Sequence, residues 1–389
     1  MIFLEKIPMD YYNGIHPIIT IFNNMIVCGI LFMPSLFNIY GIIPTASFVL
    51  VIAFCNILGY NLLFLLIKQH MGVHSIPTLA DRIYYPTDYI TNFILYAQYM
   101  STVFIYSGIA FKQMKIVMIY FNMPSPGTVA FIIMMSVGCL IFWYNGIIDI
   151  IYIPISITCA ILLSMILSFF LSDNKYDVPL YSNYPSVICD TGVFIFAFCC
   201  QNKIMILEEN TTFSHSSFKK ITMLVVLFVS LLNIVFGYIN SKFFQYFYNE
   251  SVHTWINLIP KSHIGIIIRI LLFFSLLFYI CDQMNLAMNI FSWCFSTFIP
   301  LSSIALFGLK SYQMLVILLL PLMGFIFELQ SYINGIGFIT SAYLSLFVPS
   351  FYYIMADKRV QKPIYSICAY FLLCMFFVSG IIGILVFIF

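Results

Sequence analysis

The residues best suited to bind a ligand lie in the first hydrophobic stretch of the chain, which runs from about Ile15 to Ile39. Between Asn23 and Pro34 it reads Asn-Asn-Met-Ile-Val-Cys-Gly-Ile-Leu-Phe-Met-Pro. Gly29 weakens a helix, and Pro34 cannot donate the hydrogen bond that the carbonyl of Ile30 would otherwise accept. The pattern predicts a broken membrane helix whose free backbone groups bind something polar. An ordinary kink satisfied by a neighbouring helix is the alternative.

A second hydrophobic stretch, about Ser186 to Leu207, is also irregular. It contains Asp190-Thr191-Gly192 near its start and the polar pair Gln201-Asn202 near its end. An ionisable residue inside a membrane is a candidate functional group, so Asp190 is a candidate for ion coupling, although near a span end it also fits the membrane surface. Asn23 in the first stretch fits either an ion ligand or a hydrogen bond between helices.

The composition places the elements that carry these residues in a membrane. Of the 389 residues, 62% are hydrophobic and only 8% are charged. A soluble domain has about 45–50% apolar and about 25% charged residues. We therefore expect an all-α polytopic membrane protein in a lipid bilayer. The net charge is +2 and the chain has no long basic run, which excludes a nucleic-acid partner.

Neither the cysteines nor the histidines form a pattern that indicates a cofactor. The 11 cysteines lie in or beside apolar stretches, without the spacing of a zinc site or a disulfide framework. The six histidines lie at span ends or in loops. A membrane enzyme such as an acyltransferase needs a buried base or nucleophile, usually a histidine. We therefore expect no enzyme, no cofactor and no metal site.

Hydropathy and turn residues predict about eleven spans after an N-terminal tail, 1–14. Polar loops are expected at 68–88, 112–127, 172–184, 208–220 and 241–263, and a re-entrant or interfacial stretch at 283–310, where Asn285, Asn289 and Pro300 interrupt the apolar pattern. The lysines and arginines favour a cytoplasmic N-terminus, which leaves the sequon at Asn249 on the other side. Besides the two stretches above, the predicted spans are 44–67, 89–111, 128–144, 147–171, 221–239, 264–282, 311–327, 334–355 and 364–389.

Short motifs along the chain occur together in a familiar order. They are Cys28–Pro34 followed by Leu36-Phe37 and Gly41; Phe196–Gln201; Glu208 or Glu209 followed by Phe218–Met223; Phe236-Gly237-Tyr238; Arg269; and Pro349–Tyr353. In order and spacing they resemble the amino acid/auxin permease family, over almost the whole chain. The chain departs from the family pattern at Val27, where glycine is usual, and at Gln201, where histidine is usual.

The resemblance implies a LeuT-like fold of two inverted five-helix repeats, about 15–171 and 186–355, plus an extra helix, about 364–389. It implies an amino acid transporter that works by alternating access, with the substrate between the two irregular spans. Tyr99 or Tyr106, with residues of the eighth span, would set side-chain selectivity, although packing in the core or at an interface is the more common role of such a tyrosine. The implied substrate-binding residues are Asn23, Val27, Cys28, Gly29, Ile30, Phe198, Cys199, Cys200 and Gln201.

The coupling ion is expected to be a proton. The sodium-coupled branch of the family has a threonine in the eighth span, where this chain offers only Ser275, so the candidates for ion coupling are Asn23, Ser275 and Asp190. A membrane sensor that binds amino acids, or a transporter of another small polar solute, remains an alternative. The plasma membrane and the vacuolar or lysosomal membrane are both open as locations.

Overall fold

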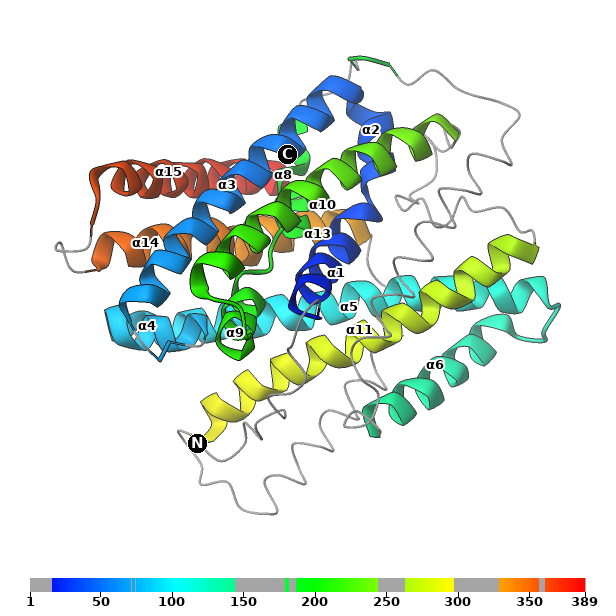
Figure 1. Ribbon diagram of the computed structural model, residues 1–389. Helices are drawn as coiled ribbons and strands as arrows, with labels where there is room; N and C mark the ends of the chain where they lie inside the picture. Colours follow the sequence, from blue (N-terminus) through cyan, green and yellow to red (C-terminus); the bar gives the residue numbers. More distant parts are fainter. Residues whose placement is uncertain are drawn as a thin grey trace. The chain divides into compact units, whose positions relative to one another are not determined.

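The computed structural model describes residues 16–70, 72–73, 75–143, 179–181, 187–243, 263–296, 329–356 and 361–388 (Figure 1). Every regular element in these ranges is helical. The chain divides into two compact units, each built from separate parts of the sequence. The first consists of Met1–Thr91, Pro179–Tyr238 and Gly337–Phe389, and the second of Asn92–Val178 and Ile239–Ile336.

Long apolar helices make the protein an all-α polytopic membrane protein. Within the described ranges, 7 helical segments are long and apolar enough to cross a membrane. Two shorter apolar helices, Pro17–Ile26 and Pro126–Gly138, accompany them. The 7 segments are Ile42–Gln69, Ile76–Tyr120, Val187–Glu209, His215–Ser241, Gly265–Ser292, Ile333–Met355 and Pro363–Leu385.

The first unit contains both irregular spans. In chain order its elements are α1 (His16–Ile30), α2 (Met33–Tyr40), α3 (Ile42–Gln69), α4 (Ile76–Tyr84), the 3-10 turn η2 (Tyr85–Thr87), the start of α5 (Asp88–Tyr120), the 3-10 turn η3 (Val187–Asp190), α8 (Thr191–Ala197), α9 (Gln201–Asn210), most of α10 (His215–Phe243), the π-helical η5 (Gly337–Ser341) and η6 (Tyr343–Phe347), α14 (Val348–Met355) and α15 (Pro363–Ile388).

The turn between α2 and α3 is made by Gly41, whose φ of 86° is a conformation that other residues rarely adopt. The next two backbone N–H groups donate to the carbonyls of Pro179 (3.1 Å) and Leu180 (3.2 Å). A Cβ atom on Gly41 would lie 2.8 Å from the Pro179 carbonyl oxygen. The turn therefore needs glycine for its backbone angle, and also because a larger residue would clash with the segment at Pro179 and Leu180.

The last long segment before α15 is not a regular α-helix. Gly337–Ser341 and Tyr343–Phe347 are wider π-helical turns, a rare form that often marks functional sites. The backbone of this segment lies very close to α8: a Cβ on Gly337 would lie only 1.8 Å from the backbone oxygen of Gly192. A Cβ on Gly59 of α3 would lie 2.8 Å from the oxygen of Ser345. Glycines thus allow this segment to pack directly against α8 and α3.

The second unit holds the rest of α5, α6 (Pro126–Trp143), α11 (His263–Ser296) and α13 (Leu329–Ile336). Within it, α6 packs on α11. The buried Arg269 of α11 donates to the side-chain oxygen of Gln113 on α5, so a polar contact compensates this buried cation. The rings of Tyr106 and Tyr279 meet edge to face at 5.1 Å.

Four sequence predictions about loops were wrong. The expected loop 208–220 is mostly helical, because α9 continues to Asn210 and α10 begins at His215. The expected loop 68–88 contains α4, whose buried Ile76, Leu79 and Ala80 recur at helical spacing and whose Ser75 forms a capping box. The expected loop 112–127 begins too early, because α5 continues to Tyr120. The expected interruption from 283 does not occur before 296, because α11 runs unbroken through Asn285 and Asn289. The predictions for 1–14, 147–171, 249 and 311–327 lie outside the described residues.

Candidate binding site at two interrupted helices

The first irregular span is a broken helix, as its glycine and proline predicted. Helix α1 ends at Ile30, and α2 begins at Met33 with Pro34 in its first turn. Between them, the N–H of Phe32 donates to the carbonyl of Gly29 over 3.2 Å, which closes a tighter turn than an α-helix has. The break therefore lies at Leu31-Phe32, where Pro34 withholds the next hydrogen-bond donor.

The second irregular span is broken as well. Helix α8 ends at Ala197 and α9 begins at Gln201, so Phe198–Cys200 are not helical. The N–H groups of Phe198 and Cys199 each donate to the carbonyl three residues earlier, both over 3.2 Å. These bonds tighten the end of α8 and leave it distinct from α9. Both breaks lie in the first unit, at corresponding positions of the two predicted repeats.

The helices before the two breaks touch at very small side chains. Helix α1 packs on α8, and a Cβ on Gly29 would lie only 2.8 Å from the Cβ of Ala197. That distance is shorter than the ordinary contact of about 3.5–4.0 Å between carbon atoms. Gly29 therefore serves two purposes, because it weakens the helix before the break and allows the close approach of α8.

The second break has a hydrogen-bond partner that the sequence pattern did not indicate. The hydroxyl of Tyr60, on α3, donates to the carbonyl of Phe198 over 2.9 Å, and both side chains are buried. Phe198 is one of the substrate-binding residues that the family resemblance implies. In this structure the Tyr60 hydroxyl already donates to the carbonyl of Phe198, so a ligand that binds this carbonyl would have to displace the Tyr60 hydrogen bond.

The predicted ligand Gln201 is held by a side chain of α3. Its Nε2 donates to Oδ1 of Asn56 over 2.9 Å, and Nδ2 of Asn56 donates to the carbonyl of Ile52, also over 2.9 Å. Oε1 of Gln201 is buried and has no hydrogen-bond partner among the described residues. Cys199 and Cys200, beside it, are not joined in a disulfide. The start of α9 thus offers one uncommitted acceptor.

Asn23 lies on α1 before the break. Its Nδ2 donates to the carbonyl of Ile19 over 2.6 Å, and its buried Oδ1 has no partner within the described part of the chain. Val27 and Cys28 belong to the last turns of α1, and Gly29 and Ile30 end it. Asn23 is six residues before Gly29, and six residues are one and two-thirds turns, so the two do not share a face of the helix.

Asp190 lies at the start of the second broken span and pairs with a tyrosine. Its Oδ2 accepts a hydrogen bond from the hydroxyl of Tyr40 over 2.9 Å, and both residues are buried. The bond joins the end of α2 to the start of α8. Sequence analysis proposed Asp190 but not Tyr40.

The third ion-coupling candidate, Ser275, belongs to the second unit. It is buried in α11, where its hydroxyl donates to the carbonyl of Leu271 over 2.8 Å. Tyr99 and Tyr106 are also buried in this unit. All of the predicted substrate-binding residues lie in the first unit instead.

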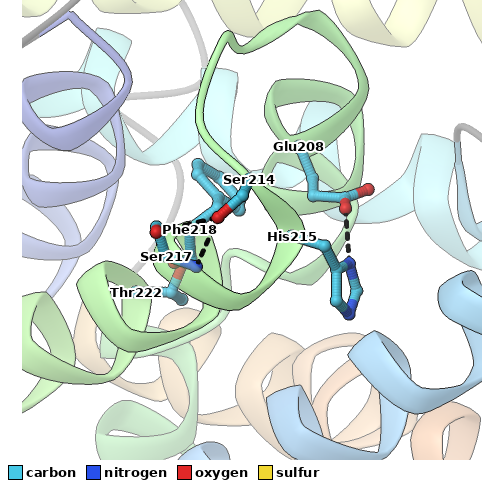
Figure 2. A network of polar contacts seen from close by, with 6 residues as sticks. All are labelled: Glu208, Ser214, His215, Ser217, Phe218 and Thr222. Atoms are coloured by element: carbon cyan, nitrogen blue, oxygen red, sulfur yellow. Dashed lines mark hydrogen bonds and ion pairs between the residues drawn. The ribbon is translucent and has the colours of Figure 1, made fainter.

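A separate polar network joins α9 to α10 in the first unit (Figure 2). Nδ1 of His215 lies 2.7 Å from Oε1 of Glu208, and the His215 ring meets the ring of Phe64 edge to face at 5.5 Å. The hydroxyl of Ser214 accepts from the N–H of Ser217 at the start of α10. These contacts hold the turn between the second broken span and the helix that follows it.

A comparison with models of known protein families and with curated protein sequences found no match to this chain. Within the described residues, no group of three or more His, Cys, Asp or Glu side chains is placed to hold a metal ion.

Proposed function

We propose that the protein is a secondary transporter of amino acids that works by alternating access, with eleven spans in a LeuT-like arrangement. The observation that carries the proposal is the contact between two broken helices, α1–α2 and α8–α9, at Gly29 and Ala197. Broken helices at equivalent positions of two repeats are a recurrent form of transporter substrate site. The resemblance to the amino acid/auxin permeases supports the amino acid as substrate.

The order of contacts between α1–α2 and α10 agrees with this topology. The rings of Phe228 and Phe22 meet at a tilt, with centroids 5.7 Å apart, and Gly237 lies against Met33 and Phe37. Residue numbers increase in the same direction along both helices, so the two run parallel. Parallel first and seventh spans are what an eleven-span chain with alternating crossings requires.

The broken helices supply the chemistry that a zwitterion needs. Helix N-termini, such as those of α2 and α9, present N–H groups to a carboxylate, and helix C-termini, such as those of α1 and α8, present carbonyls to an ammonium group. The residues 25–33 and 193–201 include no charged side chain. Binding therefore rests on backbone dipoles and amide groups, which suits a ligand without net charge.

A proton is the proposed coupling ion. Asp190 is buried beside a hydroxyl donor, in a position where uptake or release of a proton would alter the bond between α2 and the start of α8. The hydroxyl of Ser275 donates to its own helix. Coupling through Asp190 would link protonation directly to α2, the second half of the first broken span.

The test is uptake of a mixture of radiolabelled amino acids into proteoliposomes under imposed proton or sodium gradients. Wild type is compared with Gly29→Leu and with the control Gly380→Leu, because a Cβ on Gly380 meets no atom within 4 Å. Proton-driven uptake that is lost only in Gly29→Leu supports the proposal. If Gly29→Leu leaves uptake unchanged, the protein is a transporter but the substrate site is not at Gly29. Uptake driven by sodium refutes proton coupling. If wild type takes up no amino acid under either gradient, a sensor or a transporter of another solute is favoured.

A further inference from the structure

One buried side chain beside the first break has no hydrogen-bond partner for either of its polar atoms. Asn233 of α10 has no exposed surface, and neither its Oδ1 nor its Nδ2 is hydrogen-bonded within the described part of the chain. Buried polar groups are paired in the great majority of cases, and each exception calls for an explanation. Sequence analysis did not place Asn233 in the site.

The contacts of α10 place this amide beside the break. A Cβ on Gly29 would lie 3.1 Å from Nδ2 and 3.5 Å from Oδ1 of Asn233. One turn later on the same face of α10, Gly237 lies against Met33, the first residue of α2. Asn233 therefore lies next to the junction of α1 and α2, where Gly29 also meets Ala197 of α8.

The surroundings of the amide are uncharged. Residues 25–33, 193–201 and 229–237, which surround the junction on three helices, contain no Asp, Glu, Lys, Arg or His. An unpaired charge in such surroundings would cost far more than an unpaired amide. A ligand that carries a net charge is thus disfavoured, whereas a zwitterion offers both a carboxylate acceptor and ammonium donors.

We propose that Asn233 is a substrate-binding residue and that the substrate is an amino acid with an uncharged side chain. This inference rests on the proposed transport function and names its substrate class. The Nδ2 group of Asn233 donates to the carboxylate of the bound substrate or its Oδ1 accepts from the ammonium, once α1 and α8 separate enough to admit it. The amide is left unpaired in the closed contact because its partner is the ligand.

Asn233→Leu separates this role from a structural one. Leucine is close to asparagine in size but cannot hydrogen-bond, so it removes an unpaired buried amide and is expected to keep or raise the thermal stability of the ligand-free protein. It also removes a hydrogen bond to a charged ligand group, and KM for uncharged amino acids should rise about 10- to 100-fold. A structurally required amide would give the opposite result, a loss of stability.

Asn233→Asp and Ser230→Ala complete the series. The aspartate places a negative charge at the junction and should shift the preference from uncharged amino acids toward lysine and arginine. Ser230 is a buried residue of the same helix whose hydroxyl donates to the carbonyl of Leu227 over 2.7 Å, so its alanine variant should leave KM and selectivity unchanged.

The assays are uptake into proteoliposomes and the thermal shift of purified protein with each amino acid. An unchanged KM in Asn233→Leu, or an unchanged selectivity in Asn233→Asp, overturns the inference while transport stands. If Asn233→Leu fails to fold, the selectivity of Asn233→Asp is the measurement that tests the inference. If wild type transports nothing, the proposed function falls. The inference then survives only if uncharged amino acids stabilise wild type but not Asn233→Leu, and it is overturned if they stabilise neither or both.

Discussion

Replacing Tyr60 by phenylalanine tests how the second break is stabilised. The substitution removes one oxygen atom and leaves the ring, so the packing around α3 is preserved. The atom removed donates to the carbonyl of Phe198 over 2.9 Å, at the first residue after α8. Both side chains are buried, which leaves no bulk water to replace the lost donor.

The expected cost follows from the unpaired carbonyl. A buried acceptor that loses its donor costs about 1–3 kcal/mol, more than the net contribution of about 1 kcal/mol from an average hydrogen bond. In a continuous α-helix the Phe198 carbonyl would accept from the backbone N–H four residues later, but α8 ends at Ala197 and α9 begins only at Gln201, so this donor is not supplied without re-forming the helix. We expect Tyr60→Phe to lower the free energy of unfolding by about 2 kcal/mol.

The measurement is the free energy of unfolding in mild detergent during titration with a denaturing detergent, followed by circular dichroism. The control is Tyr370→Phe, because Tyr370 of α15 is 57% exposed and its variant should change the free energy by less than about 0.5 kcal/mol. If the two variants are equally stable, the Phe198 carbonyl finds another donor, and the claim that Tyr60 stabilises the break is refuted.

Three further predictions concern the first unit. Gly337→Ala places a Cβ 1.8 Å from a backbone oxygen of α8, so it should cost more than about 4 kcal/mol or prevent folding, whereas Gly380→Ala, with nothing within 4 Å, should be neutral or stabilising in the same unfolding assay. Thr91→Val keeps the side-chain shape but removes the hydroxyl that contacts two buried tyrosine hydroxyls at 3.0 and 3.1 Å, and we expect a loss of about 1–2 kcal/mol in the free energy of unfolding. His215→Ala removes the 2.7 Å contact with Glu208 and should lower the thermal midpoint slightly, by the equivalent of about 1 kcal/mol; an unchanged midpoint would show that this partly exposed pair contributes nothing.

Two failures of the loop predictions have the same origin. Polar residues predict an interruption of the helix at Asn285 and Asn289, and a loop in the segment that becomes α4. Helix α11 nevertheless continues, because an asparagine side chain does not remove a backbone hydrogen bond and a protein interior accommodates it. Helix α4 forms because Ile76, Leu79 and Ala80 find a surface to pack on, which composition does not reveal.

The sequence by itself determined the membrane class, through composition, and the place of the first break. Pro34 lacks an N–H group in any surroundings, so the loss of one helical hydrogen bond near Ile30 follows from covalent chemistry alone. Helix α1 ends at Ile30 accordingly. The eleven spans and the transport activity stay predictions.

Only the tertiary structure decided which groups meet at the breaks. Tyr60 reaches Phe198 across 138 positions of sequence, and Tyr40 reaches Asp190 across 150. Asn233 lies beside Gly29 because α10 runs along the first broken span. Helical periodicity tells which residues share a face, but the partner of that face depends on how helices far apart in the sequence pack, and packing is decided by the shapes of whole surfaces rather than by any local pattern.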